Sequence, residues 1–248
     1  MKNILSKSPA HAQQQVVGQI DTPAMKMGRA AHCLILEGEA VYQVNYATAP
    51  NCDRRTKEGK AIYAAFVESA VSREILTQDE ALSVTGMADA IGRNSLTGGL
   101  FKNGSPEVSV FGQIGGVDIK GRFDYLHPAE HIIIDLKTCL DASPDAVKKY
   151  IVNYGLHIQQ YVYSELYKAV TGKAPTDFVF VMVEKSAPFG VAVFRLNQEA
   201  LSAAKTEVRR GLAVYRQCVE SGRWPCYPET VQEIGLPVWY IKNLEAQQ

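Results

Sequence analysis

The chain has 248 residues, 46% hydrophobic and 21% charged, and its 26 basic and 26 acidic side chains give a formal net charge of zero. This balance excludes a generally basic protein that binds nucleic acid through its overall charge, although a local basic channel beside an acidic site would cancel in the sum. No apolar run reaches the length of a membrane span and the start lacks a hydrophobic signal core, so we expect a cytoplasmic protein. Five scattered cysteines favour reduced thiols over a disulfide framework.

Residues 1–100 are predicted to form a mainly helical N-terminal part. Ser8 followed by Pro9 has the pattern of a helix cap and first turn. Pro23 opens a helix over 23–37 that has an apolar face. Two further helices are expected over 58–76 and 78–96, the second ended by Gly98-Gly99.

Residues 101–200 are predicted to carry the sheet. Strands are expected over 107–111, 117–124 and 132–137, and the last two form a hairpin around the polar break 126–131. After helices over 143–153 and 156–171, a second hairpin is expected over 178–184 and 190–196. The order of elements predicts an α/β fold with a central mixed β-sheet flanked by helices, in a single domain over 1–248.

Residues 201–248 are predicted to form a C-terminal helix and a tail. Asn197 caps the helix, which runs to about Ser221. The tail contains Trp224-Pro225 and Pro237-Val238-Trp239-Tyr240, and we expect it to be irregular but anchored by its aromatic side chains.

The hairpin contains the residues with the clearest chemistry. Asp135 and Lys137 lie two apart on a strand and therefore point to the same face, and the hairpin spacing brings Asp124 opposite Asp135. Two carboxylates beside an ammonium form a site for a hard divalent cation and a charge-stabilising lysine, the chemistry of metal-dependent phosphodiester hydrolysis. An isolated Asp-x-Lys triplet is more often a solvated strand face, but apolar flanks on both strands make buried charges costly without a metal or partner.

Four further side chains are candidates, each with a simpler structural explanation. Glu107 opens the preceding strand and could add a third carboxylate, or could be an exposed strand end. His32 lies on an apolar helix, where a hydrogen-bonded core histidine is commoner than a ligand. Gln159 and Tyr163 share one helix face, where they could bind a phosphate or orient the neighbourhood of Lys137, or simply pack.

Taken in order, these residues resemble a known motif series. The series is Gly28-x-x-x-His32, Glu107, Gly121-x-x-Asp124, Asp135-x-Lys137 and Gln159-x-x-x-Tyr163. It resembles the RecB-like branch of the PD-(D/E)xK nucleases. With Ser8-Pro-Ala-His11 and Arg54-Arg-Thr-Lys-Glu-Gly-Lys60, the chain is most similar to the exonuclease VIII (RecE-type) nuclease domains of phages and prophages, over about residues 5–225.

The resemblance implies a restriction-endonuclease-like core and specific roles. Lys137 would be the catalytic lysine, and Gln159 and Tyr163 would match the motif on the helix that follows the hairpin. The ion would be Mg²⁺, which Mn²⁺ could replace. Its ligands would be His32, Glu107, Asp124, Asp135 and the Leu136 carbonyl.

The resemblance also implies a substrate and partners. The expected activity is a metal-dependent exonuclease acting on double-stranded DNA ends, 5′ to 3′, leaving 3′ overhangs for a single-strand annealing recombinase. A ring-like homotetramer would follow from the relatives. Arg54, Arg55, Lys57 and Lys60 could contact DNA phosphates, or could form an ordinary solvated loop and helix start.

Two alternatives stay open. One is a nuclease of the same fold with another polarity or an endonucleolytic preference, and the other is a catalytically silent DNA-end-binding subunit. The chain begins close to its first motif and lacks the long preceding region of some relatives, which fits either a fragment or a compact phage version.

Overall fold

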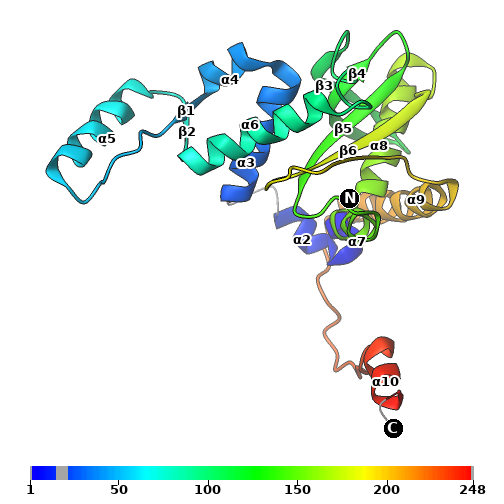
Figure 1. Cartoon of the computed structure of the whole chain (residues 1–248). Coiled ribbons are helices and arrows are strands. Elements are labelled where there is room, and N and C mark those ends of the chain that lie inside the picture. The colour runs from blue at the N-terminus through cyan, green and yellow to red at the C-terminus, as the bar shows by residue number, and fades with distance from the viewer. Residues whose placement is uncertain (1, 15–21, 247–248) are drawn as a thin grey trace.

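The computed structural model describes residues 2–14 and 22–246, and a five-stranded mixed sheet forms its centre (Figure 1). The strand order is β3-β4-β5-β6-β7, in which β5 and β6 are parallel and the other neighbours are antiparallel. The strands are β3 Ser105–Ile114, β4 Val117–His127, β5 Ile132–Cys139, β6 Asp177–Glu184 and β7 Val191–Phe194. The predicted central mixed sheet is therefore confirmed.

Helices cover both faces of this sheet, and a separate pair of short strands lies outside it. The N-terminal helical elements are α1 Lys2–Ser6, α2 Pro9–Gln14, α3 Pro23–His32, the π-helical turn η1 Cys33–Glu37, α4 Glu39–Asn45, α5 Lys57–Ser69 and α6 Gln78–Arg93. The later helices are α7 Pro144–Tyr154, α8 Leu156–Thr171, α9 Gln198–Ser221 and α10 Val238–Glu245. The outer strands, β1 Tyr46–Thr48 and β2 Glu74–Leu76, pair in parallel.

Two hydrophobic clusters, one on each side of the sheet, hold the layers together. The first joins the sheet to α7, α8 and α9, and the second joins it to α3, η1 and α6. Strand β5 is apolar on both faces: Ile133 belongs to the first cluster, Ile134 and Leu136 to the second, and all three are fully buried. A strand that is covered on both faces normally has a continuous hydrophobic sequence. Asp135 and Lys137 are therefore unusual, because they place charged side chains in a core strand.

Helix α8 contributes a side chain whose loss should test the first cluster. Leu166 is fully buried, and its Cδ1 lies 3.0 Å from where a Cβ on Gly121 would sit. We expect Leu166→Ala to lower the free energy of unfolding by about 2–5 kcal/mol, because the cavity cannot collapse fully. Leu82→Ala on α6, where the side chain is 68% exposed, should change it by less than about 0.5 kcal/mol. Urea denaturation of the two variants measures this, and equal losses would contradict the packing.

The helices predicted over 23–37, 78–96, 143–153, 156–171 and from Asn197 to Ser221 are confirmed to within a few residues, as is the hairpin of β6 and β7. Asn197 Oδ1 accepts a hydrogen bond from Ala200 N at 2.9 Å, as expected of a cap. The predicted break at 126–131 is shorter, since β4 continues to His127.

The predicted helix over 58–76 is wrong in its last part. Helix α5 ends at Ser69, Ser72 adopts a positive φ of 68°, and Glu74–Leu76 form strand β2. The reason is tertiary, because β2 pairs with β1, a strand that lies far earlier in the chain and whose own pattern is too short to predict.

The tail is anchored only at its start. Trp224 packs edge-on against Tyr215 of α9 and Tyr227 lies against His11 of α2. Trp239 and Tyr240 instead contact each other on α10 and are 65% and 43% exposed. The prediction of an irregular tail anchored by aromatics is therefore wrong for α10, which is helical and lies away from the sheet (Figure 1).

Candidate metal centre

The site lies where strands β4 and β5 separate. Their pairing runs from His127–Ile132 to Tyr125–Ile134, and Asp124 and Asp135 come next in the same register. At this point the Asp124 carboxylate enters the gap, where its Oδ2 accepts a hydrogen bond from Leu136 N at 2.8 Å. The expected placement of Asp124 opposite Asp135 is confirmed.

Lys137 bridges the two carboxylates. Its ammonium contacts the Asp135 carboxylate directly and lies 3.7 Å from Asp124 Oδ2. Burial lowers the pKa of Lys137, but the charges of Asp135 and Asp124 outweigh that effect and hold it above its usual range. The ammonium therefore keeps its proton at neutral pH and is positioned to stabilise negative charge.

Asp135 is almost fully buried and is held from two sides. Besides Lys137, it contacts Gln159 of α8, whose Nε2 donates to Asp135 Oδ1 at 2.7 Å. Burial raises the pKa of Asp135 to about 6 despite the opposing charge of Lys137. Its carboxylate is therefore ionised at neutral pH, and Gln159 fixes its orientation.

Tyr163 lies one helical turn after Gln159 and supports this arrangement by packing. Its ring contacts Phe123 with centroids 5.2 Å apart, and it lies close over Gly121, where a Cβ would be 3.0 Å from Tyr163 Cε1. Burial, followed by the charge of Asp135, raises the pKa of the phenol. Helix α8 thus contacts the β4–β5 hairpin at two points. Gln159 donates to the Asp135 carboxylate, and Tyr163 packs against Phe123.

His32 brings an imidazole to the site from α3, which packs on the side of β5 opposite α8. It ends α3 at the point where the helix widens into the π-helical turn, a feature often found at functional sites. Its Nδ1 lies 3.8 Å from Asp124 Oδ2, and its ring is also within hydrogen-bonding range of the Leu136 backbone. Burial, and then the charge of Lys137, lower its pKa to about 4, so the ring is neutral at pH 7, the form that binds metals.

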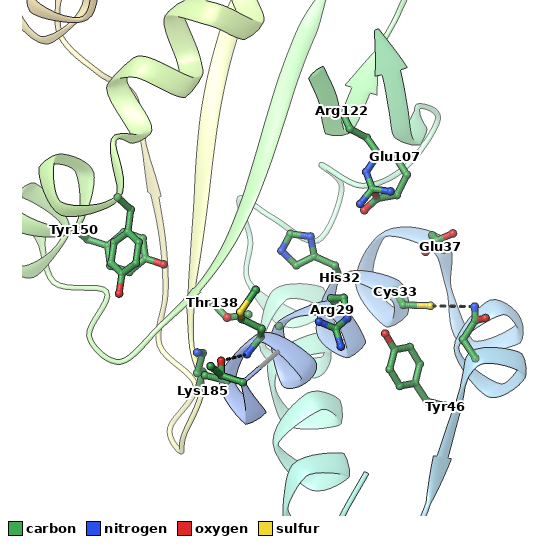
Figure 2. A pocket seen from close by; sticks show the side chains of 16 residues that line it. Arg29, His32, Cys33, Glu37, Tyr46, Glu107, Arg122, Thr138, Tyr150 and Lys185 are labelled. Atoms are coloured by element: carbon green, nitrogen blue, oxygen red, sulfur yellow. Dashed lines mark hydrogen bonds and ion pairs between the residues drawn. The ribbon is translucent and has the colours of Figure 1, made fainter. Parts of the chain in front are cut away.

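Glu107 reaches the site from a strained backbone position. Its φ is +52°, in the left-handed region that costs about 1–3 kcal/mol for a residue other than glycine. The β3–β4 pairs on either side of it place it opposite Asp124. Glu107 Oε2 lies 2.7 Å from Nε of Arg122, and burial raises the pKa of the carboxyl. Figure 2 shows this Glu107–Arg122 pair beside His32.

These donors fit a divalent cation. One ligand atom each from His32, Glu107 and Asp124 lie within 4.8 Å of one another. Glu107 Oε2 and Asp135 Oδ2 are buried beside cationic groups but make no hydrogen bond. Buried carboxylate oxygens in that state are costly unless a cation completes their environment. Carboxylates with one imidazole suit Mg²⁺ or Mn²⁺.

The structure does not bring all the sequence candidates together. Among the described residues, Asp135 lies outside the group of three ligand atoms and is held by Lys137 instead. The Leu136 carbonyl accepts a hydrogen bond from Lys137 Nζ at 3.5 Å.

The basic residues 54–60 lie far from the site, in the loop before α5 and the first turn of α5, at the far end of an arm (Figure 1). There Arg54 stacks on Tyr63 and Arg55 pairs with Asp53.

Sequence reasoning missed Arg122. It lies between Gly121 and Asp124, and strand alternation puts it on the same side of β4 as Asp124. That spacing was a usable signal for a cation facing the cluster, but its partner Glu107 could be identified only from the β3–β4 register.

Comparison with known proteins places this geometry in a family. The family model described as "PDDEXK-like domain of unknown function (DUF3799)" matches residues 1–236. The chain belongs to this family. The prediction of a PD-(D/E)xK nuclease fold is therefore confirmed.

One solved structure shares the fold of this PDDEXK-like domain at low sequence identity. A crystal structure named "Putative exonuclease" from Eubacterium rectale superposes with a TM-score of 0.55 at 14% identity, covering 92% of this chain and 88% of that one. A phage-related exonuclease from Haemophilus somnus 129PT gives a TM-score of 0.34 at 13% identity, over 78% of this chain and 95% of that one. No protein with curated annotation matches the chain.

In the described part of the PDDEXK-like domain, every helix is too short or too polar to cross a lipid bilayer.

The hydrogen bond from Gln159 to Asp135 has an exposed counterpart that makes a matched test. Gln113 Nε2 donates to Asp118 Oδ1 at the same 2.7 Å, but on the exposed β3–β4 hairpin. We expect Gln159→Leu to lower kcat about tenfold or more, because the buried carboxylate loses a bond of about 1.5–3 kcal/mol. Gln113→Leu should leave kcat unchanged. Steady-state cleavage kinetics measure kcat for both variants. Equal kcat values would rule out a role for Gln159 in positioning the Asp135 carboxylate.

Proposed function

We propose that this chain is a metal-dependent exodeoxyribonuclease that hydrolyses phosphodiester bonds at double-stranded DNA ends, 5′ to 3′, and leaves 3′ overhangs. The observation that carries the proposal is Lys137 held between Asp124 and Asp135, beside the ligand atoms of His32, Glu107 and Asp124. Membership of the PDDEXK-like family and the fold shared with the Eubacterium rectale protein support it.

The residues divide the work of hydrolysis between them. His32, Glu107 and Asp124 would hold Mg²⁺, with the Leu136 carbonyl as a further oxygen, and Asp135 would join them where the ion replaces Lys137 as the partner of its carboxylate. When bound, such an ion activates a water molecule and neutralises phosphate charge. Lys137 supplies a fixed positive charge for the phosphoryl oxygens in the transition state, and because it is held in place before reaction it costs no reorganisation.

Before an ion binds, burial keeps His32 neutral at pH 7, the form that can donate its ring nitrogen to a metal. Gln159 keeps the Asp135 carboxylate in one orientation. No covalent bond between protein and DNA is needed, because a water molecule attacks the phosphorus and the 3′ oxygen leaves, giving a 5′-phosphate product.

Incubation with linear and covalently closed circular duplexes tests the function. With Mg²⁺ or Mn²⁺ we expect linear DNA to shorten from labelled 5′ ends, circles to stay intact, and EDTA to stop the reaction. Nicking of circles would replace the proposal with the endonucleolytic alternative. Binding of ends without any cleavage would replace it with the silent end-binding subunit.

Two further parts of the proposal concern partners. A 3′ overhang is the substrate of a single-strand annealing recombinase. A homotetramer that encloses the DNA would let the enzyme digest a strand without dissociating from it. Sedimentation of the purified chain tests the second point, for which a mass four times that of the 27.3 kDa chain is expected.

A further inference from the structure

The cleft that contains the metal cluster continues well past it. It has a volume of about 860 Å³, and Glu107, Arg122 and His32 line one part of it. The other part is lined by Thr138, Tyr150, Tyr154 and Lys185, which none of the roles above uses. Figure 2 shows Tyr150 and Lys185 on the far side of Thr138 from the Glu107–Arg122 pair. We call the surface formed by Tyr150, Tyr154 and Lys185 the Tyr–Lys shelf.

Lys185 presents an ammonium that no carboxylate neutralises within the described part of the chain. Its backbone is fixed, since Lys185 N donates to Cys139 O at 3.0 Å. The adjacent carboxylate, Glu184, is directed elsewhere and accepts from Ala142 N and Gly190 N. Arg122, by contrast, is paired with Glu107. Half-burial lowers the pKa of Lys185, as expected for a cation without a counter-ion.

The position of Lys185 relative to the cluster follows from the register. Asp135 pairs with Phe180, and Lys185 lies just beyond the end of β6. Those residues span roughly 16 Å at the rise of a strand. An anion held by Lys185 is therefore too far away to be the phosphate at the metal cluster, but it could be another phosphate of the same strand.

Two tyrosines of α7 line the same part of the cleft as Lys185. The rings of Tyr150 and Tyr154 lie close together, with centroids 4.1 Å apart and planes tilted by 32°, and Tyr154 is 61% exposed. Tyr150 is half-buried, and burial raises the pKa of its phenol. The pair thus forms an aromatic surface in the cleft that extends from the half-buried ring of Tyr150 to the exposed ring of Tyr154.

Aromatic side chains that share a cleft with a cation lacking a counter-ion form the combination that binds single-stranded nucleic acid. Each unpaired base offers a π-face for stacking, and each phosphate offers a charge. In duplex DNA the base faces are covered by their neighbours, so an aromatic surface recognises only nucleotides that have left the helix.

We propose that the Tyr–Lys shelf binds unpaired nucleotides of the DNA strand, with a base stacked on Tyr154 and a phosphate at the Lys185 ammonium. This inference rests on the proposed function and narrows its substrate to ends that are frayed or carry a single-stranded segment. Tyr150 supports Tyr154 from below and does not itself contact the base.

The test measures binding rather than cleavage, using the full chain in EDTA. Fluorescence anisotropy of a labelled 12-nucleotide single strand and of a blunt 12-base-pair duplex gives both affinities. Tyr154→Ala and Lys185→Ala should each weaken single-strand binding about fivefold or more, with a smaller effect on the blunt duplex. Lys185→Ala should also reduce the slope of log K against log salt by roughly 0.7, the value for one phosphate contact on a single strand. Tyr154→Phe should restore affinity, because the ring is kept.

Matched controls use residues of the same type outside the cleft. Tyr227, also 61% exposed, and Lys205, exposed on α9, are replaced by alanine and should bind as the unmodified chain does. The proposal is overturned if Tyr154→Ala binds the single strand normally, if it loses single strand and blunt duplex equally, or if the unmodified chain does not bind the single strand. Cleavage of linear duplex with Mg²⁺ is read separately, so failure here leaves the proposed nuclease activity standing.

Discussion

Lys137→Ala is expected to reduce DNA cleavage about 10²- to 10⁴-fold while substrate affinity changes little. The ammonium of Lys137 is fixed beside both Asp124 and Asp135, and among residues 2–14 and 22–246 it is the only cation in contact with both carboxylates. A preorganised charge at the reacting phosphate contributes most in the transition state, so its loss appears in kcat. Single-turnover cleavage of a 5′-labelled linear duplex measures the effect.

The same substitution has a structural consequence that serves as a control. Removing the ammonium leaves Asp124 and Asp135 facing each other, and breaking a buried ion pair costs about 3–5 kcal/mol. The metal-free variant should therefore melt at a lower temperature, and Mn²⁺ should raise its melting temperature more than that of the unmodified chain. Lys120→Ala, on the exposed part of β4, should keep both activity and stability. Cleavage by a folded Lys137→Ala variant at the normal rate would remove the assigned role.

Asp124→Asn is expected to weaken Mn²⁺ binding about 100-fold or more and to abolish cleavage at millimolar Mg²⁺. The amide keeps the shape of the side chain, and its oxygen can still accept the hydrogen bond from Leu136 N. What it loses is the negative charge at the centre of the cluster, 3.8 Å from His32 Nδ1. Hard divalent cations depend on charged oxygen ligands. Isothermal titration with Mn²⁺ measures the dissociation constant.

Glu130→Gln is the matched control for the charge change, since Glu130 is exposed in the turn that joins β4 to β5. It should bind Mn²⁺ like the unmodified chain. If Asp124→Asn also bound Mn²⁺ normally, the ion would have to be held elsewhere and the ligand set assigned to this hairpin would be wrong.

Local pattern was sufficient to predict the hairpin at the centre of the site. Alternation along β4 and β5 placed Asp135 and Lys137 on one face, and a short turn fixed Asp124 opposite Asp135. These are relations within a single hairpin, where sequence spacing converts directly into distance. The helical spacing of Gln159 and Tyr163 likewise predicted one face of α8, and that face meets the hairpin.

Contacts between segments that are distant in the chain could not be predicted from the sequence. The position of Glu107 depends on the β3–β4 register and on a positive φ that its residue type disfavours. Strand β2 exists because it pairs with β1 rather than because of its own propensity. The Tyr–Lys shelf exists because α7 and the residue after β6 line the same cleft, and no spacing in the sequence connects Tyr154 with Lys185.

The basic residues 54–60 form a clear pattern in the sequence, but they lie far from the metal centre (Figure 1). Arg54 and Arg55 are conspicuous in the sequence, but each already has a local partner, in Tyr63 and Asp53. Their assignment to DNA contact stays a prediction. It would require DNA that extends from the cleft along the arm carrying α5 (Figure 1).

A crystal of the full chain soaked in Mn²⁺ and measured at an anomalous wavelength tests the central idea most directly. An anomalous peak is expected among His32, Glu107 and Asp124, at roughly 2.0–2.5 Å from their ligand atoms. A fully soaked crystal with ordered side chains and no peak between them would contradict the metal centre, and with it the proposed hydrolysis.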